Sequence, residues 1–453
     1  MRLAIAVISC AIAALLVPFA LDWRAPYTAN VRPWVLAFLI VAALVFMIAG
    51  IVTARRRQAR PVALRLLGAC AAALAAFALI ATLASETRFR SARQQVLDAD
   101  LNALERLGRH FIVGYRDLDD ILALIERRAV AGVYVSANNV QGLSAAEIKQ
   151  QIGAMQDLRR AQHLPPLWIA TDQEGGGVSR LSPPLSRLPS LAALVAAHPD
   201  RAERLDAVRE FALLQGHELS DLGVNLNFAP VIDVNHGIVN PADRYTRIHQ
   251  RAISGDPDMV AEVAGAYCAG LAETGVRCTL KHFPGLGRVF DDTHSGSADL
   301  NAPLGELDKS DWVPFRALLG HANAFTMLAH ARLTALDRDH PVSTSAPVIA
   351  GALRGAWRHD GVLITDDFSM GAIYRGRAGV GGAAVAAINA GADLILISFD
   401  PDQYYAAMRA LLDAEAQGQL RRDVLQDSER RLAGAAPSDP LGPHIFRPAD
   451  VSN

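Results

Sequence analysis

Eight short apolar segments, each followed by a longer segment of helical pattern, place the strongest constraint on how this chain can fold. The apolar segments cover residues 110–115, 131–136, 167–172, 226–233, 278–282, 325–330, 361–366 and 392–398. They are continuous rather than alternating, which is typical of parallel strands buried on both faces. Helical patterns lie between them, for example over residues 202–222, 259–274 and 382–390. Eight strand–helix units predict an α/β fold, a (β/α)8 barrel of the TIM type, with a doubly wound open sheet as the main alternative.

Three long apolar stretches precede these units, over residues 3–21, 34–52 and 66–83. Each is about long enough to cross the ~30 Å hydrocarbon core of a bilayer, so we expect about three transmembrane helices. A cleavable signal peptide is less favoured for the first stretch, because residues 20–24 make a poor cleavage site and two more stretches follow. Buried core helices are the other alternative.

Arginine placement predicts the orientation of these stretches. The segment between the first and second contains only Arg24 and Arg32. The segment between the second and third is much more basic and contains Arg55, Arg56, Arg57, Arg60 and Arg65. Because arginine-rich loops stay in the cytoplasm, we expect everything after residue 85 on the periplasmic, extracytoplasmic side of a bacterial inner (plasma) membrane.

Charge is distributed unevenly along the chain. Residues 1–96 contain 11 arginines and 2 acids, whereas the remainder contains 33 basic and 44 acidic residues, a net charge of −11. An acidic soluble part argues against a nucleic-acid partner. Two of the four cysteines, Cys268 and Cys278, lie in this part without metal-ligand spacing. They could form one disulfide in an oxidising compartment, but two buried thiols are the favoured interpretation.

Polar side chains gather where the predicted strands end, which in a barrel of this kind is the face that carries the active site. These residues are Asp172-Gln173-Glu174, Asp233, Lys281-His282, His330 and Asp366-Asp367. Lys281 is one of only three lysines in the chain. A buried lysine is costly unless it is paired, so its position at a strand end favours a functional role.

Several motifs, in this order, resemble those of the NagZ-type β-N-acetylhexosaminidases of glycoside hydrolase family 3. The resemblance covers about residues 105–435 and rests on residues 172–176 (DQEGG), 226–233 (LNFAPVID), 281–287 (KHFPGLG), 292–294 (DTH) and 365–370 (TDDFSM). The chain departs from the family pattern at Leu286, where histidine is usual, and over residues 295–300, which replace a loop ending in proline. We expect a more flexible loop after His294.

The resemblance implies the roles of the candidate site residues. Asp366 is the expected nucleophile of a retaining mechanism, in which a carboxylate forms a covalent glycosyl-enzyme. His294 is the expected general acid/base, and Asp292 the carboxylate that orients its ring. The neighbouring Asp291 leaves a one-residue uncertainty about that partner. The residues expected to bind sugar hydroxyls are Asp172, Arg251, Lys281 and His282.

The predicted organisation is a transmembrane anchor over residues 1–85, a connecting helix over 86–109, the barrel over 110–435 and an irregular tail over 436–453. The predicted function is a membrane-anchored retaining exo-β-N-acetylglucosaminidase that removes terminal β-linked GlcNAc from peptidoglycan or its fragments. Its partners would be that carbohydrate and the lipid bilayer, with no nucleic acid, no metal and no organic cofactor. The alternatives are a β-N-acetylglucosaminide phosphorylase and a non-catalytic membrane protein that binds cell-wall sugar.

Overall fold

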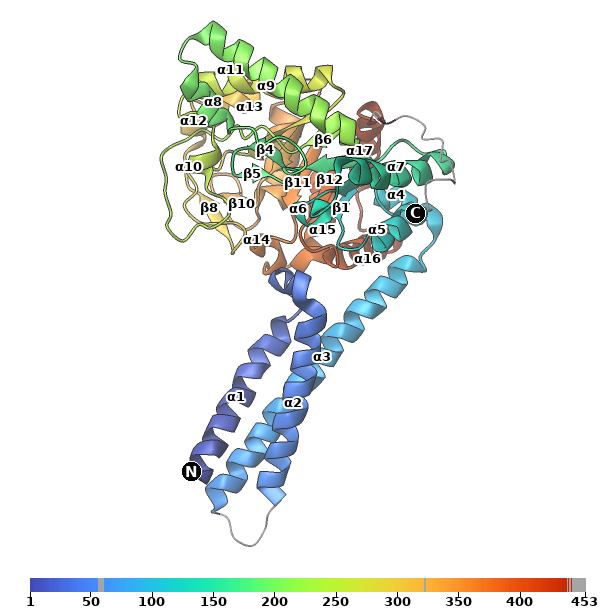
Figure 1. Cartoon of the computed structure of the whole chain (residues 1–453), viewed down its shortest axis with the longest axis vertical. Coiled ribbons are helices and arrows are strands. Elements are labelled where there is room, and N and C mark those ends of the chain that lie inside the picture. Colours follow the sequence, from blue (N-terminus) through green and yellow to red (C-terminus); the bar gives the residue numbers. More distant parts are fainter. Residues whose placement is uncertain (56–60, 322, 438, 440, 442–453) are drawn as a thin grey trace. The chain divides into compact units, whose positions relative to one another are not determined.

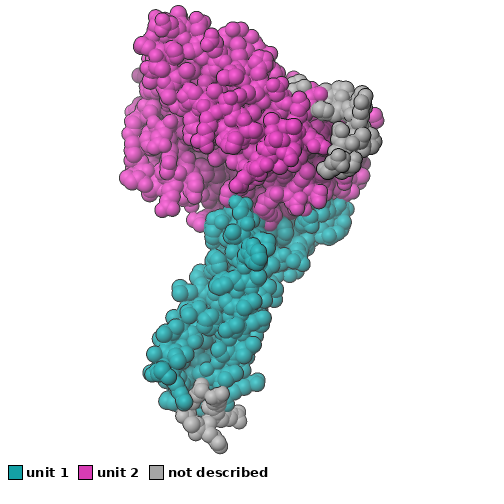
Figure 2. Space-filling model, viewed as in Figure 1, with its two compact units in different colours: residues 1–98 teal, residues 99–453 magenta. Residues whose placement is uncertain are grey.

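The computed structural model describes residues 1–55, 61–321, 323–437, 439 and 441 (Figure 1). Contacts divide the chain into two compact units, Met1–Asp98 and Ala99–Asn453, coloured teal and magenta in Figure 2. We call them the N-terminal unit and the barrel unit.

The N-terminal unit consists of three long helices, each long and apolar enough to cross a membrane. They are α1 (Arg2–Asp22), α2 (Arg32–Arg55) and α3 (Val62–Leu97), with the short 3-10 helix η1 (Pro26–Val31) between the first two. Only 22%, 17% and 28% of their most apolar windows are buried. Most of these apolar side chains therefore face outward, as expected for contact with lipid rather than water.

The predicted apolar stretches all lie within these helices. Of the arginines that predicted the orientation, Arg56, Arg57 and Arg60 lie outside the described residues, as does most of the predicted irregular tail. Helix α3 continues without a break through residue 85, the expected end of the anchor. In this polar part, Glu86 accepts a hydrogen bond of 2.6 Å from Arg24, which ties the α1–α2 connection to α3.

The barrel unit is built on eight parallel strands in the order β6-β3-β2-β1-β12-β11-β9-β7. The strands are β1 (Phe111–Gly114), β2 (Gly132–Tyr134), β3 (Trp168–Thr171), β6 (Leu226–Asn227), β7 (Cys278–Phe283), β9 (Ala324–Leu328), β11 (Leu363–Asp367) and β12 (Leu394–Ile397). Single bridges from Leu226 to Arg277 and from Val231 to Lys281 join the two ends of this sheet. The sheet is therefore a nearly closed barrel, which confirms the TIM-type prediction and excludes the open sheet.

Helices surround the barrel strands (Figure 1). The longer ones are α4 (Leu101–Gly108), α5 (Leu118–Glu126), α7 (Ala145–Ala161), α9 (Arg201–Leu222), α11 (Pro257–Glu273), the π-helix η3 (Pro347–Ala356), α15 (Gly379–Ala390), α16 (Gln403–Ala416) and α17 (Arg422–Gly434). Local sequence explains their limits. Asp200 caps α9 by accepting the N–H groups of Ala202 and Glu203, and Gly223 ends it at a φ of 95°.

Apolar side chains from seven of the eight strands or their ends fill the barrel interior. They include Ile112, Tyr134, Trp168, Leu226, Phe325, Ile364 and Leu396, all buried. This interior is a packed core, so ligand can enter only at the barrel ends. The loops at the C-terminal ends of the strands carry two small sheets, β4 (Gln173–Gly175) with β5 (Val178–Ser179), and β8 (Ala298–Leu300) with β10 (Ala331–Leu333).

Shorter helical segments complete the connections. They are α6 (Ala137–Val140), α8 (Leu191–Ala197), α10 (Ile248–Arg251), α12 (Leu304–Leu307), α13 (Val313–Leu318), η2 (Val342–Thr344) and α14 (Gly371–Tyr374). The loop that carries His294 is held by backbone hydrogen bonds to α14. The N–H groups of Gly371 and Ala372 donate to the carbonyls of His294 and Thr293 at 2.9 and 3.1 Å, and β8 follows directly. These contacts fix the start of the segment over residues 295–300, whose greater flexibility stays a prediction.

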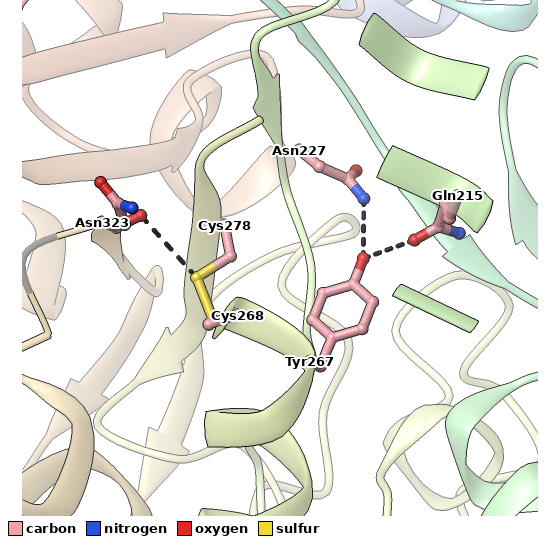
Figure 3. Close-up of a disulfide and its surroundings, with 6 residues drawn as sticks. All are labelled: Gln215, Asn227, Tyr267, Cys268, Cys278 and Asn323. Atoms are coloured by element: carbon pink, nitrogen blue, oxygen red, sulfur yellow. Dashed lines mark hydrogen bonds between the residues drawn. A yellow bond between two sulfur atoms is a disulfide. The ribbon is translucent and has the colours of Figure 1, made fainter. Parts of the chain in front are cut away.

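A disulfide joins Cys268 on α11 to Cys278, the first residue of β7 (Figure 3). The prediction of two buried thiols was wrong. Helix α11 ends at Glu273 and the chain returns at once into β7, so the two Cα atoms lie 5.5 Å apart, within the usual range for a disulfide. Beside it, the Tyr267 hydroxyl donates to Gln215 at 2.5 Å and accepts from Asn227 at 3.0 Å, which fixes α11 to α9 and β6.

Candidate active site

Lys281 lies at the C-terminal end of β7 and is almost fully buried, with a side chain 2% exposed. Its Nζ lies 2.6 Å from Asp172 Oδ1 and 2.6 Å from Glu174 Oε1. Two carboxylates thus compensate the desolvation of the ammonium group, as the prediction of a paired lysine requires. The contact joins the ends of β7 and β3, which lie on either side of β6 in the barrel.

Glu174 is a central residue of the site, although it is not among the residues predicted from the sequence to bind sugar. Arg251 holds it in a bidentate pair, with Nε 2.9 Å from Oε2 and Nη2 2.6 Å from Oε1. Burial alone would raise the pKa of Glu174, but Arg251 and Lys281 outweigh it and lower the pKa well below the usual range. Its place two residues after Asp172 in a strand-end motif was the only sequence signal.

Arg251 is mostly buried rather than part of an exposed ion pair. Besides the pair with Glu174, its Nη1 donates to the Thr246 carbonyl at 2.9 Å, and its Nη2 lies 3.5 Å from His282 Nε2. The arginine therefore connects the segment before α10 with the ends of β3 and β7. This arrangement can present an N–H edge to a ligand at the barrel mouth.

Asp172 follows β3 and is oriented through both carboxylate oxygens. Oδ1 accepts from Lys281, and Oδ2 accepts from the Tyr134 hydroxyl at 2.8 Å. Burial and the charge of Asp172 raise the pKa of Tyr134 far above its usual value, so the phenol keeps its proton. The Asp172 side chain is 22% exposed and can accept further hydrogen bonds from a ligand hydroxyl.

His282 is fixed by the fully buried Asp233. Its Nδ1 lies 2.7 Å from Asp233 Oδ2, while Oδ1 of the same carboxylate accepts the backbone N–H groups of His282 and Leu286 at 3.2 and 2.7 Å. Leu286, which stands where the related family usually has histidine, is buried and packs beside Val231 and Ala329. The carboxylate sets the ring orientation of His282, so its Nε2 faces Arg251.

His294 lies on the loop between β7 and β8 with a side chain 39% exposed. Its Nδ1 lies 2.8 Å from Asp292 Oδ1, so Asp292, and not Asp291, contacts the ring. The Thr246 hydroxyl donates to the same oxygen at 2.8 Å, and the ring of Tyr245 lies 5.3 Å from that of His294. Burial would raise the pKa of Asp292, but hydrogen bonds and charge from His294 lower it to about 2.

Asp366 is partly exposed near the end of β11. Burial would raise the pKa of this carboxyl, but the charges of His282, His330 and His294 together lower it. The imidazole of the candidate acid/base thus acts electrostatically on the candidate nucleophile. An ionised carboxylate and an imidazole held by a second carboxylate are the groups that covalent glycoside cleavage with proton transfer requires.

Asp367 and His330 have structural partners. Asp367 accepts from the N–H groups of Ser369, Ser398 and Phe399 at 2.9–3.0 Å, and so supports the loop after β12. His330 is buried, with Nδ1 2.8 Å from the Ser343 hydroxyl and Nε2 3.0 Å from the Asp367 carbonyl. Among the described residues, no group of three or more His, Cys, Asp or Glu side chains is arranged to hold a metal ion.

Comparison with known proteins shows which family this chain resembles. The model of the glycosyl hydrolase family 3 N-terminal domain matches residues 97–435. The β-hexosaminidase LpqI of Mycobacterium tuberculosis is 32% identical over 341 residues, which are 74% of this chain and 83% of that protein. A β-hexosaminidase of Xylella fastidiosa is 39% identical over 272 residues, which are 59% of this chain and 76% of that protein.

A solved structure supports the same assignment. The glycoside hydrolase family 3 β-N-acetylglucosaminidase from Paenibacillus sp. FPU-7 superposes with a TM-score of 0.68 at 33% identity, over 73% of this chain and 61% of that one. The present chain thus spans about three fifths of the Paenibacillus protein. The family model matches most of the chain, and the barrel carries the five motifs that resemble those of the NagZ-type enzymes. The chain therefore belongs to glycosyl hydrolase family 3, among its β-hexosaminidases.

Proposed function

We propose that this protein is a membrane-anchored retaining exo-β-N-acetylglucosaminidase. The observation that carries the proposal is the contact of 2.8 Å between Asp292 Oδ1 and His294 Nδ1, on the same barrel face as the partly exposed Asp366 at the end of β11. A glycosidase that uses histidine in place of a second carboxylate needs such a partner to keep the imidazole oriented. The names of the relatives support N-acetylglucosamine as the sugar.

The reaction would follow a double displacement. An Asp366 oxygen attacks the anomeric carbon, and the bond from that carbon to the leaving oxygen breaks while His294 donates a proton to that oxygen. A water molecule then loses a proton to His294 as its oxygen attacks the same carbon, which releases Asp366 and the sugar. Two inversions retain the anomeric configuration, and His294 returns to its initial protonation state.

Substrate binding would use the network at the ends of β3 and β7. The carboxylate of Asp172 accepts hydrogen bonds from sugar hydroxyls, while Lys281, His282 and Arg251 donate to the sugar. Glu174 orients two of these donors, since it contacts both Arg251 and Lys281. The network orients the ring against Asp366, so the anomeric carbon is in place before the bond breaks.

The barrel unit would act outside the cytoplasm, on terminal GlcNAc of peptidoglycan or its fragments. Two independent features support that side of the membrane. Positive charge concentrates between the second and third apolar stretches, and the barrel unit contains the Cys268–Cys278 disulfide. Disulfides persist in the periplasm and outside cells, and are rare in the reducing cytosol.

The test is hydrolysis of an aryl β-N-acetylglucosaminide by the full-length protein in detergent micelles. We expect hydrolysis with net retention of the anomeric configuration, which NMR of the first-formed anomer detects. We also expect the activity of Asp366→Asn to be at least about 1000-fold lower than that of the wild type. The matched control is Asp360→Asn, which changes an aspartate at the other end of β11. No turnover by the wild type on this substrate or on muropeptides would favour a non-catalytic sugar-binding protein.

A phosphorylase is the second candidate, favoured by the imidazole acid/base. A neutral or cationic ring does not repel phosphate as a carboxylate would, so phosphate could intercept the intermediate in place of water. Release of GlcNAc 1-phosphate in the presence of phosphate, with little free GlcNAc, would identify this activity. Turnover that is independent of phosphate and yields free GlcNAc supports the hydrolase.

A further inference from the structure

A cavity of about 600 Å³ lies at the end of the barrel opposite the active site. Its lining comes from Arg277, which directly precedes β7, from the end of α13 and the start of β9 with the loop between them, from the loop that precedes β11, and from the last turn of α17. The candidate catalytic residues follow or end the same strands. The cavity therefore belongs to the N-terminal face of the barrel, and the proposed reaction does not use it.

The lining of this cavity is strongly basic. It contains one carboxylate, that of Asp360, and five arginines, namely Arg277, Arg316, Arg358, Arg430 and Arg431. The chain after residue 96 is acidic overall, with 44 acids against 33 bases. An acidic chain would not be expected to gather five guanidinium groups around one cavity. They create a local positive potential that attracts anions.

Aromatic rings position two of these arginines. The Cζ of Arg316 lies 4.1 Å from the ring centroid of Trp357, and that of Arg277 lies 5.4 Å from the ring of Phe325. Trp357 and Phe325 themselves line the cavity. A guanidinium held against a ring presents its N–H groups at the edge, in the plane where a carboxylate or phosphate binds bidentately.

The nearby carboxylates are already shared among arginines. Asp360 accepts from Arg430 at 2.7 and 3.0 Å and lies 3.4 Å from Arg431. Asp393 is fully buried and accepts from Arg431 at 2.9 Å and from Arg354 at 2.7 Å. In the described part of the chain, the exposed Arg358 side chain makes no hydrogen bond or ion pair. Arg316 also pairs with Asp308, at 2.6 Å, but Asp308 does not line the cavity. The lining itself therefore contains five arginines against the one carboxylate of Asp360.

His359 adds a polar atom that lacks a partner. Its ring is buried in the cavity wall, and Nε2 has no hydrogen-bond partner among the described residues. Burial and the charge of Arg354 lower the pKa of His359 to about 4, so the ring is neutral near pH 7. Buried polar atoms are nearly always hydrogen-bonded, so this enclosed nitrogen is an unsatisfied position in the wall of the cavity rather than a direct contact for a ligand.

We propose that this cavity binds a small multivalent oxyanion, whose phosphate or carboxylate groups contact the arginines while an apolar part lies against Trp357. The volume is in the range of small-molecule sites, which run from about 300 to 1,000 Å³. Phosphate and carboxylate share the geometry that guanidinium groups recognise. The proposal does not depend on the sugar or the reaction at the other end of the barrel.

The test is isothermal titration calorimetry of the full-length protein in detergent micelles, at about 150 mM total ionic strength to screen weak surface binding. One arm uses pyrophosphate and the other tricarballylate, so that phosphate and carboxylate ligands are distinguished. The variants are Arg358→Gln, Arg277→Gln and the double substitution. The matched control is Arg422→Gln, an exposed arginine at the other end of α17 that does not line the cavity.

We expect saturable binding of at least one of the two anions, with an affinity about tenfold weaker in the double variant and unchanged in the control. Hydrolysis of the aryl β-N-acetylglucosaminide should stay within about twofold of wild type in all variants, because none of these arginines lies at the active site. Arg358 is exposed, so Arg358→Gln keeps the test valid if Arg277→Gln does not fold. No binding of either anion, or binding that the cavity variants do not weaken, would overturn the proposal.

Discussion

The hydroxyl of Thr246 donates to Asp292 Oδ1 at 2.8 Å, the same oxygen that lies 2.8 Å from His294 Nδ1. The backbone N–H of His294 donates to this oxygen as well, at 2.9 Å. Asp292 is therefore fixed from three directions, and through it the imidazole proposed to transfer the proton. Thr246 is a positioning residue in this arrangement, since it acts on His294 through the carboxylate.

Thr246→Val should lower kcat about tenfold with little change in KM, because valine keeps the shape of threonine but removes one hydrogen bond to a charged acceptor. Steady-state kinetics with the aryl β-N-acetylglucosaminide measures both constants. The control is Thr334→Val, which removes a threonine hydroxyl bonded to Asn301 rather than to Asp292. An unchanged kcat in Thr246→Val would show that Asp292 needs no support from this side.

Glu174→Gln should destabilise the barrel unit by about 3 kcal/mol, because it removes one of two carboxylates that compensate the buried Lys281. It should also raise KM, since Arg251 loses its bidentate partner. Thermal unfolding followed by circular dichroism and steady-state kinetics measure the two effects. Glu273→Gln is the control: its pair with Arg209 is exposed on both sides, and its removal should cost less than about 1 kcal/mol.

Acid should destabilise the fold partly through Asp292. Its pKa of about 2 in the folded chain lies below the usual value near 3.9, so the unfolded chain binds the proton first as pH falls. The stabilisation, of the order of 2 kcal/mol, is therefore complete above about pH 5 and is lost progressively down to about pH 2. Melting temperatures measured between these limits should fall less steeply in Asp292→Asn than in the wild type; parallel curves would contradict this assignment.

Removal of the disulfide should destabilise the barrel unit by about 2–3 kcal/mol, because a short loop is no longer closed in the unfolded chain. The measurement compares melting temperatures of the wild type and the double variant Cys268→Ala/Cys278→Ala. The control is the double variant Cys10→Ala/Cys70→Ala. A reductant should lower its melting temperature by as much as it lowers that of the wild type, because the Cys268–Cys278 bond is still present. Mass spectrometry that finds Cys268 and Cys278 alkylated without prior reduction would contradict the pairing.

Much of the barrel was predictable from the sequence because each strand–helix unit is a local pattern. Continuous apolar runs marked all eight barrel strands, and the helices α9, α11 and α15 lie where their patterns predicted. The motifs also marked which strand ends carry Asp172, Lys281, His282 and Asp366. Burial on both faces demands apolar residues at every position of such a strand, so its signal lies entirely within a few consecutive residues.

Which distant side chains meet depends on the folded path of the whole chain. Glu174 and Arg251 are 77 residues apart in sequence, and Thr246 and Asp292 are 46 apart, so no local pattern could pair them. The Cys268–Cys278 bond depends likewise on how α11 returns to β7. The strands, the apolar helices and the chemistry available at each strand end can all be read from local sequence. Only the closure of the barrel brought these groups together, because contacts between separate loops depend on the path of the whole chain.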